Sequence, residues 1–154
     1  MTEISLSDTE QLIVNSLGFT KTLTKYNRTR FTAGNGKPGK IIDIIEAPDS
    51  LYGRMGVGAV HHAAFRAEDE NAQLNIRSQL LNENIEATEV IDRKYFKSIY
   101  FREPGNVLFE VATDPPGFLV DEDENELGTS LQLPPWLEPK RNAIETVLPE
   151  ISVP

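Results

Sequence analysis

The residues of this sequence best suited to metal chemistry are two adjacent histidines and one carboxylate far from them along the chain. His61 and His62 are the two histidines, and Glu110 stands inside the apolar run VLFEVA. A carboxylate within an apolar strand is costly unless it is paired or bound to a metal. One imidazole and one carboxylate on neighbouring strands suit a divalent ion such as Fe(II), Mn(II) or Zn(II). The pattern therefore indicates a metal site built from side chains of both types.

The two histidines are expected to play different roles, because neighbours in a strand point to opposite faces. At most one of them can then bind a metal together with Glu110. The simpler alternative is that both histidines are polar residues at a strand edge. In that case Glu110 lies on the wetter face of an alternating strand. The residue types alone leave both interpretations open.

Tyr100 is the next candidate, since it lies ten residues before Glu110 and a turn at 104–106 brings the two strands side by side. A phenol beside a metal can donate a hydrogen bond to a metal-bound oxygen atom. A packing aromatic is the alternative. Three arginines could hold an anionic substrate, although a solvated arginine is the simpler interpretation: Arg66, Arg93 and Arg102.

Composition restricts the class of protein that positions these residues. The chain has 154 residues, a net charge of -9 and no cysteine. The acidic balance argues against a nucleic-acid partner, and the lack of cysteine excludes disulfides and thiolate metal sites. No apolar run approaches the roughly 18 residues that a membrane helix needs, and the N-terminus lacks the pattern of a signal peptide. We therefore expect a cytoplasmic protein without a membrane partner.

Two stretches of the sequence resemble each other and predict an internal repeat. SDTEQL (7–12) is similar to EDENAQL (68–74), and GKIIDIIEAPD (39–49) is similar to GNVLFEVATD (105–114). Each half reads as a strand, a helix and three further strands. Such modules bury their apolar faces against each other around a cleft. The fold class expected is α+β with two modules, and a ferredoxin-like sandwich is the alternative.

The predicted boundaries follow from this repeat. A first, shortened module occupies 1–50, a second occupies 51–114, and a proline-rich tail at 115–154 packs on the same single domain. The strands expected in the two modules are 2–7, 19–26, 30–33, 40–47, 57–66, 85–91, 97–102 and 107–112. The first helix begins at a cap formed by Ser7 or Asp8 and ends at Gly18. The second helix covers 70–83 and is capped by Asp69. Its core face is expected to contain Leu74, Ile76, Leu80 and Leu81. The tail is expected to form a helix near 138–147.

At this point three segments become recognisable as a family pattern. VHHAAFRAED (60–69), VIDRKYFKSIYFREPGNVLFEVATDPPGF (90–118) and LGTSLQLPPWLEP (127–139) resemble the C-terminal half of bacterial ring-cleaving dioxygenases. These enzymes, which act on hydroquinones and catechols, belong to the vicinal oxygen chelate superfamily together with glyoxalase I and bleomycin-resistance proteins. The resemblance is strong from 52 to 139 and weak over the first 50 residues.

The resemblance implies a fold and a set of roles. Members are built from βαβββ modules whose paired mixed sheets form a metal-binding cup. By this likeness His62 and Glu110 bind Fe(II), with Mn(II) or Zn(II) as alternatives, His61 points away, and Tyr100 hydrogen-bonds substrate or oxygen. From residue type, we expect Arg93 or Arg66 to orient a small aromatic substrate, with Arg102 as a further substrate contact. The implied reaction cuts the ring beside a hydroxyl-bearing carbon.

The sequence also departs from the family pattern. The family takes a further histidine ligand from the first strand of a partner module, and the overlaid repeat places Met1 opposite His62. Glu3 lies on the same strand face and is a possible weak third ligand. The chain is about half the length of these enzymes. The missing ligand could therefore come from a homodimer or from a separately encoded N-terminal half.

Three functions remain open from the sequence. The first is an Fe(II)-dependent extradiol-type dioxygenase or a half-length subunit of one. The second is a non-catalytic binding protein of the same superfamily, in which the metal site has decayed and the cup holds a small molecule. The third, an isomerase or lyase of the glyoxalase type, needs a fuller ligand set than the chain contains.

Overall fold

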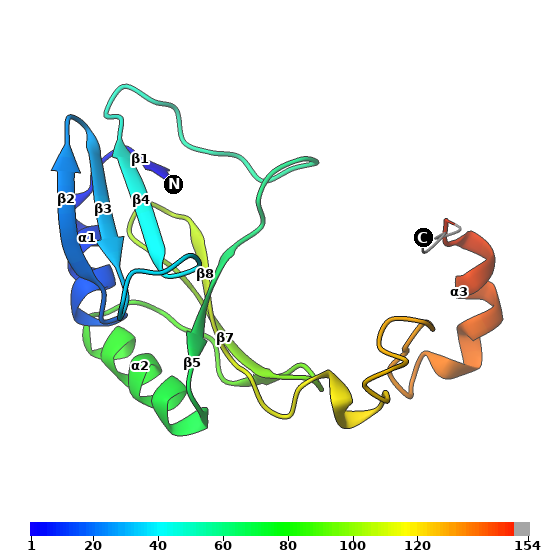
Figure 1. The fold of residues 1–154 in the computed structure, drawn as a ribbon. Helices are drawn as coiled ribbons and strands as arrows, with labels where there is room; N and C mark the ends of the chain where they lie inside the picture. Colours follow the sequence, from blue (N-terminus) through cyan, green and yellow to red (C-terminus); the bar gives the residue numbers. More distant parts are fainter. Residues whose placement is uncertain (150–154) are drawn as a thin grey trace. The chain divides into compact units, whose positions relative to one another are not determined.

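The computed structural model describes residues 1–149 and divides into two compact units (Figure 1). The first unit runs from Met1 to Gly117, and the second begins at Phe118. Among the described residues, no helix combines the length and apolar character that crossing a membrane requires.

The first half of the larger unit is a four-stranded mixed sheet with one helix. Its elements in chain order are β1 (Thr2–Glu3), α1 (Ser7–Asn15), β2 (Thr20–Lys25), β3 (Arg28–Thr32) and β4 (Ile41–Glu46). The spatial order is β1-β4-β3-β2, in which β1 is parallel to β4 and the other pairs are antiparallel. The helix therefore connects β1 to the far edge of the sheet.

The second half repeats this arrangement. Its elements are β5 (Ala63–Ala67), α2 (Glu70–Asn82), β6 (Ile91–Asp92), β7 (Lys97–Arg102) and β8 (Leu108–Thr113). The spatial order is β5-β8-β7-β6, again with the first strand parallel to the last (Figure 1). The predicted α+β class with two strand–helix–three-strand modules is thus confirmed.

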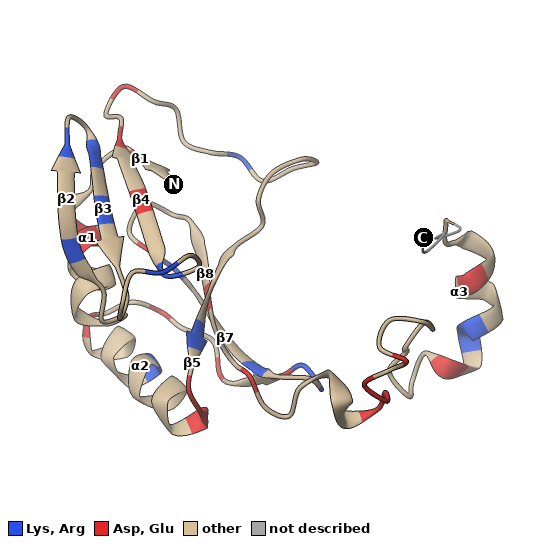
Figure 2. Ribbon diagram, in the orientation of Figure 1, with Lys and Arg blue, Asp and Glu red and all other residues tan. Residues whose placement is uncertain are grey.

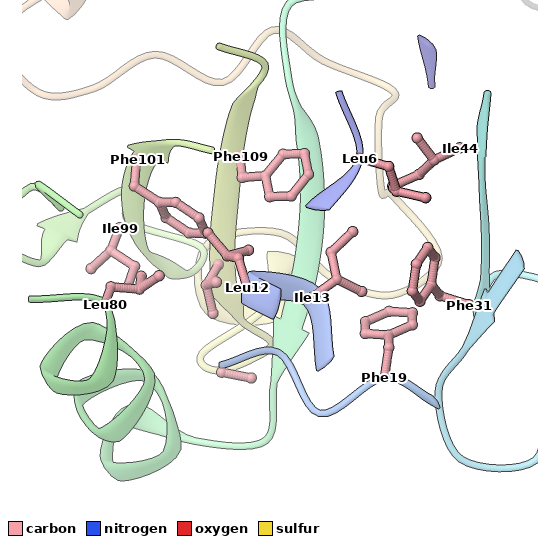
Figure 3. Packing of buried hydrophobic residues seen from close by; sticks show 12 residues of the cluster. Leu6, Leu12, Ile13, Phe19, Phe31, Ile44, Leu80, Ile99, Phe101 and Phe109 are labelled. Carbon is pink, nitrogen blue, oxygen red and sulfur yellow. The ribbon is translucent and has the colours of Figure 1, made fainter. Parts of the chain in front are cut away.

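One hydrophobic cluster joins the two modules. Leu12 and Ile13 of α1 are fully buried, and so are Phe31 and Ile44 of the first sheet. The same cluster continues into the second module through a further set of buried side chains (Figure 3): Leu80, Ile99, Phe101, Phe109 and Val111. Burying each such side chain is worth roughly 1.5–3 kcal/mol. The apolar faces of the modules are therefore closed against each other.

The two helices begin differently. The carboxylate of Asp69 accepts a hydrogen bond from the Ala72 backbone N–H at 2.7 Å, which confirms the predicted cap of α2. The predicted side-chain cap of α1 by Ser7 or Asp8 is wrong. The residue before that helix is Leu6, whose backbone N–H instead donates to Glu46 Oε1 at 3.1 Å.

The core face of α2 also differs from the prediction. Leu74 and Leu81 are exposed, whereas Gln73 is fully buried beside Leu80. The Gln73 amide donates to the carbonyl oxygens of Lys97 at 2.9 Å and Val111 at 2.8 Å. These bonds satisfy the buried amide nitrogen, and the predicted residues Leu80 and Ile76 do pack in or against the core.

The strand that carries the histidines is shorter than predicted. β5 begins at Ala63 rather than at Val57, so His61 and His62 precede it. Ala63 pairs with Phe109, and the partner strand β8 itself begins at Leu108. Residues before the histidines therefore have no strand to pair with.

The regular structure described in the second unit consists of short helical segments. Its elements are two 3-10 turns, Phe118–Val120 and Glu138–Lys140, and helix α3 (Arg141–Val147), which confirms the helix predicted near 138–147. Arg141 pairs with Glu138 at 2.7 Å and Glu145 at 3.0 Å. Acidic residues gather between 121 and 126 (Figure 2). That this tail packs on the larger unit stays a prediction.

Candidate metal centre

His62 and Glu110 converge on a single point at the centre of the second sheet. Glu110 lies on β8, between β5 and β7, and pairs with Ala64, two residues after His62. The distance from His62 Nε2 to Glu110 Oε2 is 2.8 Å. The glutamate side chain is 5% exposed and the imidazole is 33% exposed. A buried carboxylate thus faces one imidazole that remains accessible from solvent.

Tyr100 and Arg93 extend this cluster on the side of β7. Tyr100 is the cross-strand partner of Glu110, and its hydroxyl donates to Glu110 Oε1 at 2.6 Å. The Tyr100 ring meets the His62 ring edge to face, with centroids 5.9 Å apart. The Arg93 guanidinium lies 5.4 Å from the centre of the Tyr100 ring and 3.4 Å from its hydroxyl oxygen. Both Glu110 oxygens therefore have a defined partner.

His61 does not point away from its neighbour as predicted. Its Nδ1 lies 2.9 Å from the Nδ1 of His62, and the two rings are perpendicular. The prediction assumed the alternation of a β-strand, but the ladder begins only at Ala63. The sequence offers one signal that β5 does not extend toward the N-terminus: the glycines at 53, 56 and 58.

The geometry of His62 and Glu110 fits two neighbouring ligands of one divalent ion. Ligand atoms about 2.1 Å from an ion and at right angles to each other lie about 3 Å apart. The 2.8 Å between Nε2 and Oε2 matches this spacing closely. Within residues 1–149 no group of three or more His, Asp or Glu side chains could hold an ion. The described chain therefore offers two candidate ligands at this point.

The other predicted site residues lie elsewhere. Arg66 pairs with the exposed Asp114 at 3.1 Å. Arg102 donates to the Asn106 carbonyl oxygen at 2.8 Å. Glu3 is buried, and its Oε2 is 2.9 Å from the Thr9 hydroxyl. The structure does not bring any of these three side chains into hydrogen-bond contact with the His62–Glu110 pair.

Glu3 instead takes part in a buried acid pair that sequence reasoning missed. The Thr9 hydroxyl lies 2.6 Å from Glu103 Oε2 as well as 2.9 Å from Glu3 Oε2. One hydroxyl proton can be donated to only one of the two carboxylates at a time, so a proton held by the acid pair would satisfy the other contact. Burial, followed by the nearby Glu103, raises the pKa of Glu3 to about 7. Because the two glutamates are 100 residues apart, no local pattern could indicate their contact.

Comparisons with known proteins agree with this architecture. No protein-family model matches the sequence. The chain is 43% identical to "Putative ring-cleaving dioxygenase MhqE" of Bacillus subtilis, over 93% of this chain and 46% of that protein. It is 39% identical to a chlorohydroquinone/hydroquinone 1,2-dioxygenase of Sphingobium indicum, over 73% of this chain and 36% of that protein.

Solved structures give the same result at the level of the fold. A "putative dioxygenase" from Bacillus subtilis matches the whole chain with a TM-score of 0.90 and 38% identity, over 49% of its own length. More distant structures of the glyoxalase and bleomycin-resistance groups, at 18% and 13% identity, share the fold with TM-scores of 0.57 and 0.64.

The chain has the fold of the vicinal oxygen chelate superfamily and is related in sequence to bacterial ring-cleaving dioxygenases of that group. It spans about half the length of the curated relatives that it matches.

Proposed function

We propose that this chain is the metal-binding half of an Fe(II)-dependent ring-cleaving dioxygenase that acts on hydroquinone- or catechol-like aromatics. The observation that carries the proposal is the 2.8 Å approach of His62 Nε2 to Glu110 Oε2, with Tyr100 hydrogen-bonded to the other carboxylate oxygen. The named relatives support the choice of reaction. Manganese or zinc are the alternative ions, and a cytoplasmic location fits the absence of cysteine.

Within this site the protein residues have separate tasks. His62 and Glu110 hold the ion, which supplies Lewis acidity and oxygen activation when bound. Tyr100 fixes the orientation of the Glu110 carboxylate, as hydrogen-bond partners of metal ligands commonly do. The Arg93 guanidinium lies against the Tyr100 ring, and it could orient the aromatic ring of a substrate by a similar cation–π contact.

A second chain is proposed to complete the site. The described residues supply one imidazole and one carboxylate, whereas the facial arrangement typical of non-haem iron takes a second imidazole. The sequence contains no other histidine outside the adjacent pair. The partner is a second copy of this chain or a separately encoded half, which agrees with the length of the relatives.

A second function is favoured by the same shortage of ligands. The two candidate ligand side chains, His62 and Glu110, already contact each other. The surface between the paired sheets could then hold a small aromatic molecule without a metal. This would make the chain a binding protein of the resistance type.

Iron titration of protein purified without oxygen separates the two functions. We expect the wild-type chain to bind Fe(II) stoichiometrically and Glu110→Gln to lose this binding, because the amide removes the negative charge but keeps the shape. Asp114→Asn is the matched control, since that carboxylate lies outside the site and should leave binding unchanged. Equal iron occupancy in wild type and Glu110→Gln would sink the dioxygenase proposal.

A further inference from the structure

A cavity of about 390 Å³ adjoins the candidate metal centre on the second sheet. Its lining includes Leu108 of β8 and Arg102 of β7, which lie two positions from Glu110 and Tyr100 respectively. Side chains two positions apart on a strand share a face. His61, which contacts His62, also lines the cavity. A molecule in this space would therefore reach toward the His62–Glu110 pair.

The charge of the cavity is opposite to that of the chain. Asp and Glu outnumber Lys and Arg by 24 to 15 in the sequence. Among the described residues that line the cavity there is no Asp or Glu, whereas Arg54 and Arg102 both contribute. Two guanidinium groups in a lining that has no Asp or Glu of its own favour an anion, and they match a carboxylate in shape.

The position of Arg102 is defined by one hydrogen bond. Its Nη1 donates to the Asn106 carbonyl oxygen at 2.8 Å, and Asn106 itself lines the cavity. A guanidinium carries five N–H groups, so the remaining donors are available to a ligand. Arg102 can thus bind an anionic group without giving up the contact that holds it in place.

The remaining walls suit an aromatic ring. Met55, Val60 and Leu108 supply apolar surface, and Tyr52 adds a phenol. The volume lies within the usual range of small-molecule sites, roughly 300–1,000 Å³. Apolar walls with two arginines on one side are the complement of a ring that bears a carboxylate.

We propose that this cavity binds the acidic substituent of the substrate, so that the preferred substrate is a dihydroxybenzene carrying a carboxylate. The inference rests on the proposed function, because the ring hydroxyls would face the His62–Glu110 pair. The carboxylate would lie between Arg54 and Arg102. A neutral hydroquinone would leave both guanidinium groups without a partner from the substrate.

Calorimetric titration of the Fe(II)-loaded full chain tests the proposal. The ligands are 2,5-dihydroxybenzoate and its uncharged counterpart 2,5-dihydroxybenzamide. We expect the acid to bind roughly tenfold or more tightly than the amide, since charge-assisted hydrogen bonds are the stronger ones. Arg102→Gln and Arg54→Gln should remove this preference, whereas Arg28→Gln, on the first sheet and outside the cavity, should keep it.

Benzoate, which lacks the ring hydroxyls, separates this inference from the proposed function. Benzoate binding to the metal-free chain that is lost in Arg102→Gln supports the cavity even if iron binding fails. Iron binding by the wild type together with equal affinity for acid and amide overturns the cavity proposal alone. Failure of the acid and of benzoate to bind at all also overturns it.

Discussion

The two modules place a carboxylate at matching points of their sheets but give it opposite surroundings. Asp43 on β4 is the cross-strand partner of Arg30, just as Glu110 on β8 is the partner of Tyr100. Asp43 contacts Arg30 at 2.7 Å and Arg28 at 3.2 Å, whereas Glu110 contacts a phenol and an imidazole. A hydrogen bond from Arg30 lowers the pKa of Asp43 to about 2.

This difference explains why one module is a candidate metal site and the other is not. Two guanidinium groups already neutralise Asp43 and would repel a divalent ion. Tyr100 adds no guanidinium beside Glu110, and the other partner of this carboxylate is the His62 imidazole, whose Nε2 lies 2.8 Å from Glu110 Oε2. The same topology therefore carries a surface ion pair in one module and a candidate ligand pair in the other, and the cross-strand partner of the carboxylate differs between them.

The largest effect is expected from changing Tyr100, the cross-strand partner of Glu110. Tyr100→Arg would give Glu110 the surroundings of Asp43, and we expect Fe(II) affinity to fall by roughly 100-fold, at the upper end of losses seen when groups supporting metal ligands are changed. Calorimetric titration under nitrogen measures the change. Tyr100→Phe is the control, and it should lose far less because it adds no positive charge. Similar losses in both variants would contradict the electrostatic explanation.

A second prediction concerns the acid pair that joins the modules. The pKa of Glu3 is about 7 in the folded chain against its usual 4.5. A raised pKa means that the folded state holds the proton more tightly, so its stabilising contribution is complete below about pH 4.5. That contribution is lost as pH rises through about 7. The loss should be on the order of 1–3 kcal/mol in the free energy of unfolding.

Urea unfolding between pH 4.5 and 8 measures this effect as a difference between variants. Glu3→Gln should remove most of the pH dependence relative to wild type, because the amide is neutral throughout. Glu10→Gln, a change at the partly exposed ion pair with Lys21, should keep the wild-type slope. Parallel curves for wild type and Glu3→Gln would show that the pair holds no linked proton.

The smallest effect is expected at the ion pairs of the first sheet. The pKa of Asp43 is lowered, so its stabilising contribution is present above its usual 3.8 and is lost as pH falls through about 2. Because the arginines are exposed, Asp43→Asn should lower Tm by about 2 °C or less at pH 7. Thermal melts at low and high salt test this, since screening should remove the difference. A salt-independent loss would indicate that Asp43 has a packing role.

Much of the fold could be predicted because its signals are local. The Asp69 cap and the bounds of β7 follow from neighbouring residues, and the repeat follows from matching letters in the two halves. The start of β5 was missed because it depends on where β8 begins, 45 residues further on. The exposure of Leu74 could not be predicted, because the neighbouring Gln73 occupies the buried position and is held there by hydrogen bonds to two strands distant in sequence.

The candidate site shows the same division. The sequence by itself determined which side chains were chemically able to hold a metal, since residue type and strand position are local properties of His62, Tyr100 and Glu110. The tertiary structure alone decided that these three meet, that His61 joins them, and that Glu3 lies with Glu103 instead. Burial and hydrogen-bond partners come from strands and turns brought together by the closing of the two modules, and such contacts leave no trace in any short stretch of sequence.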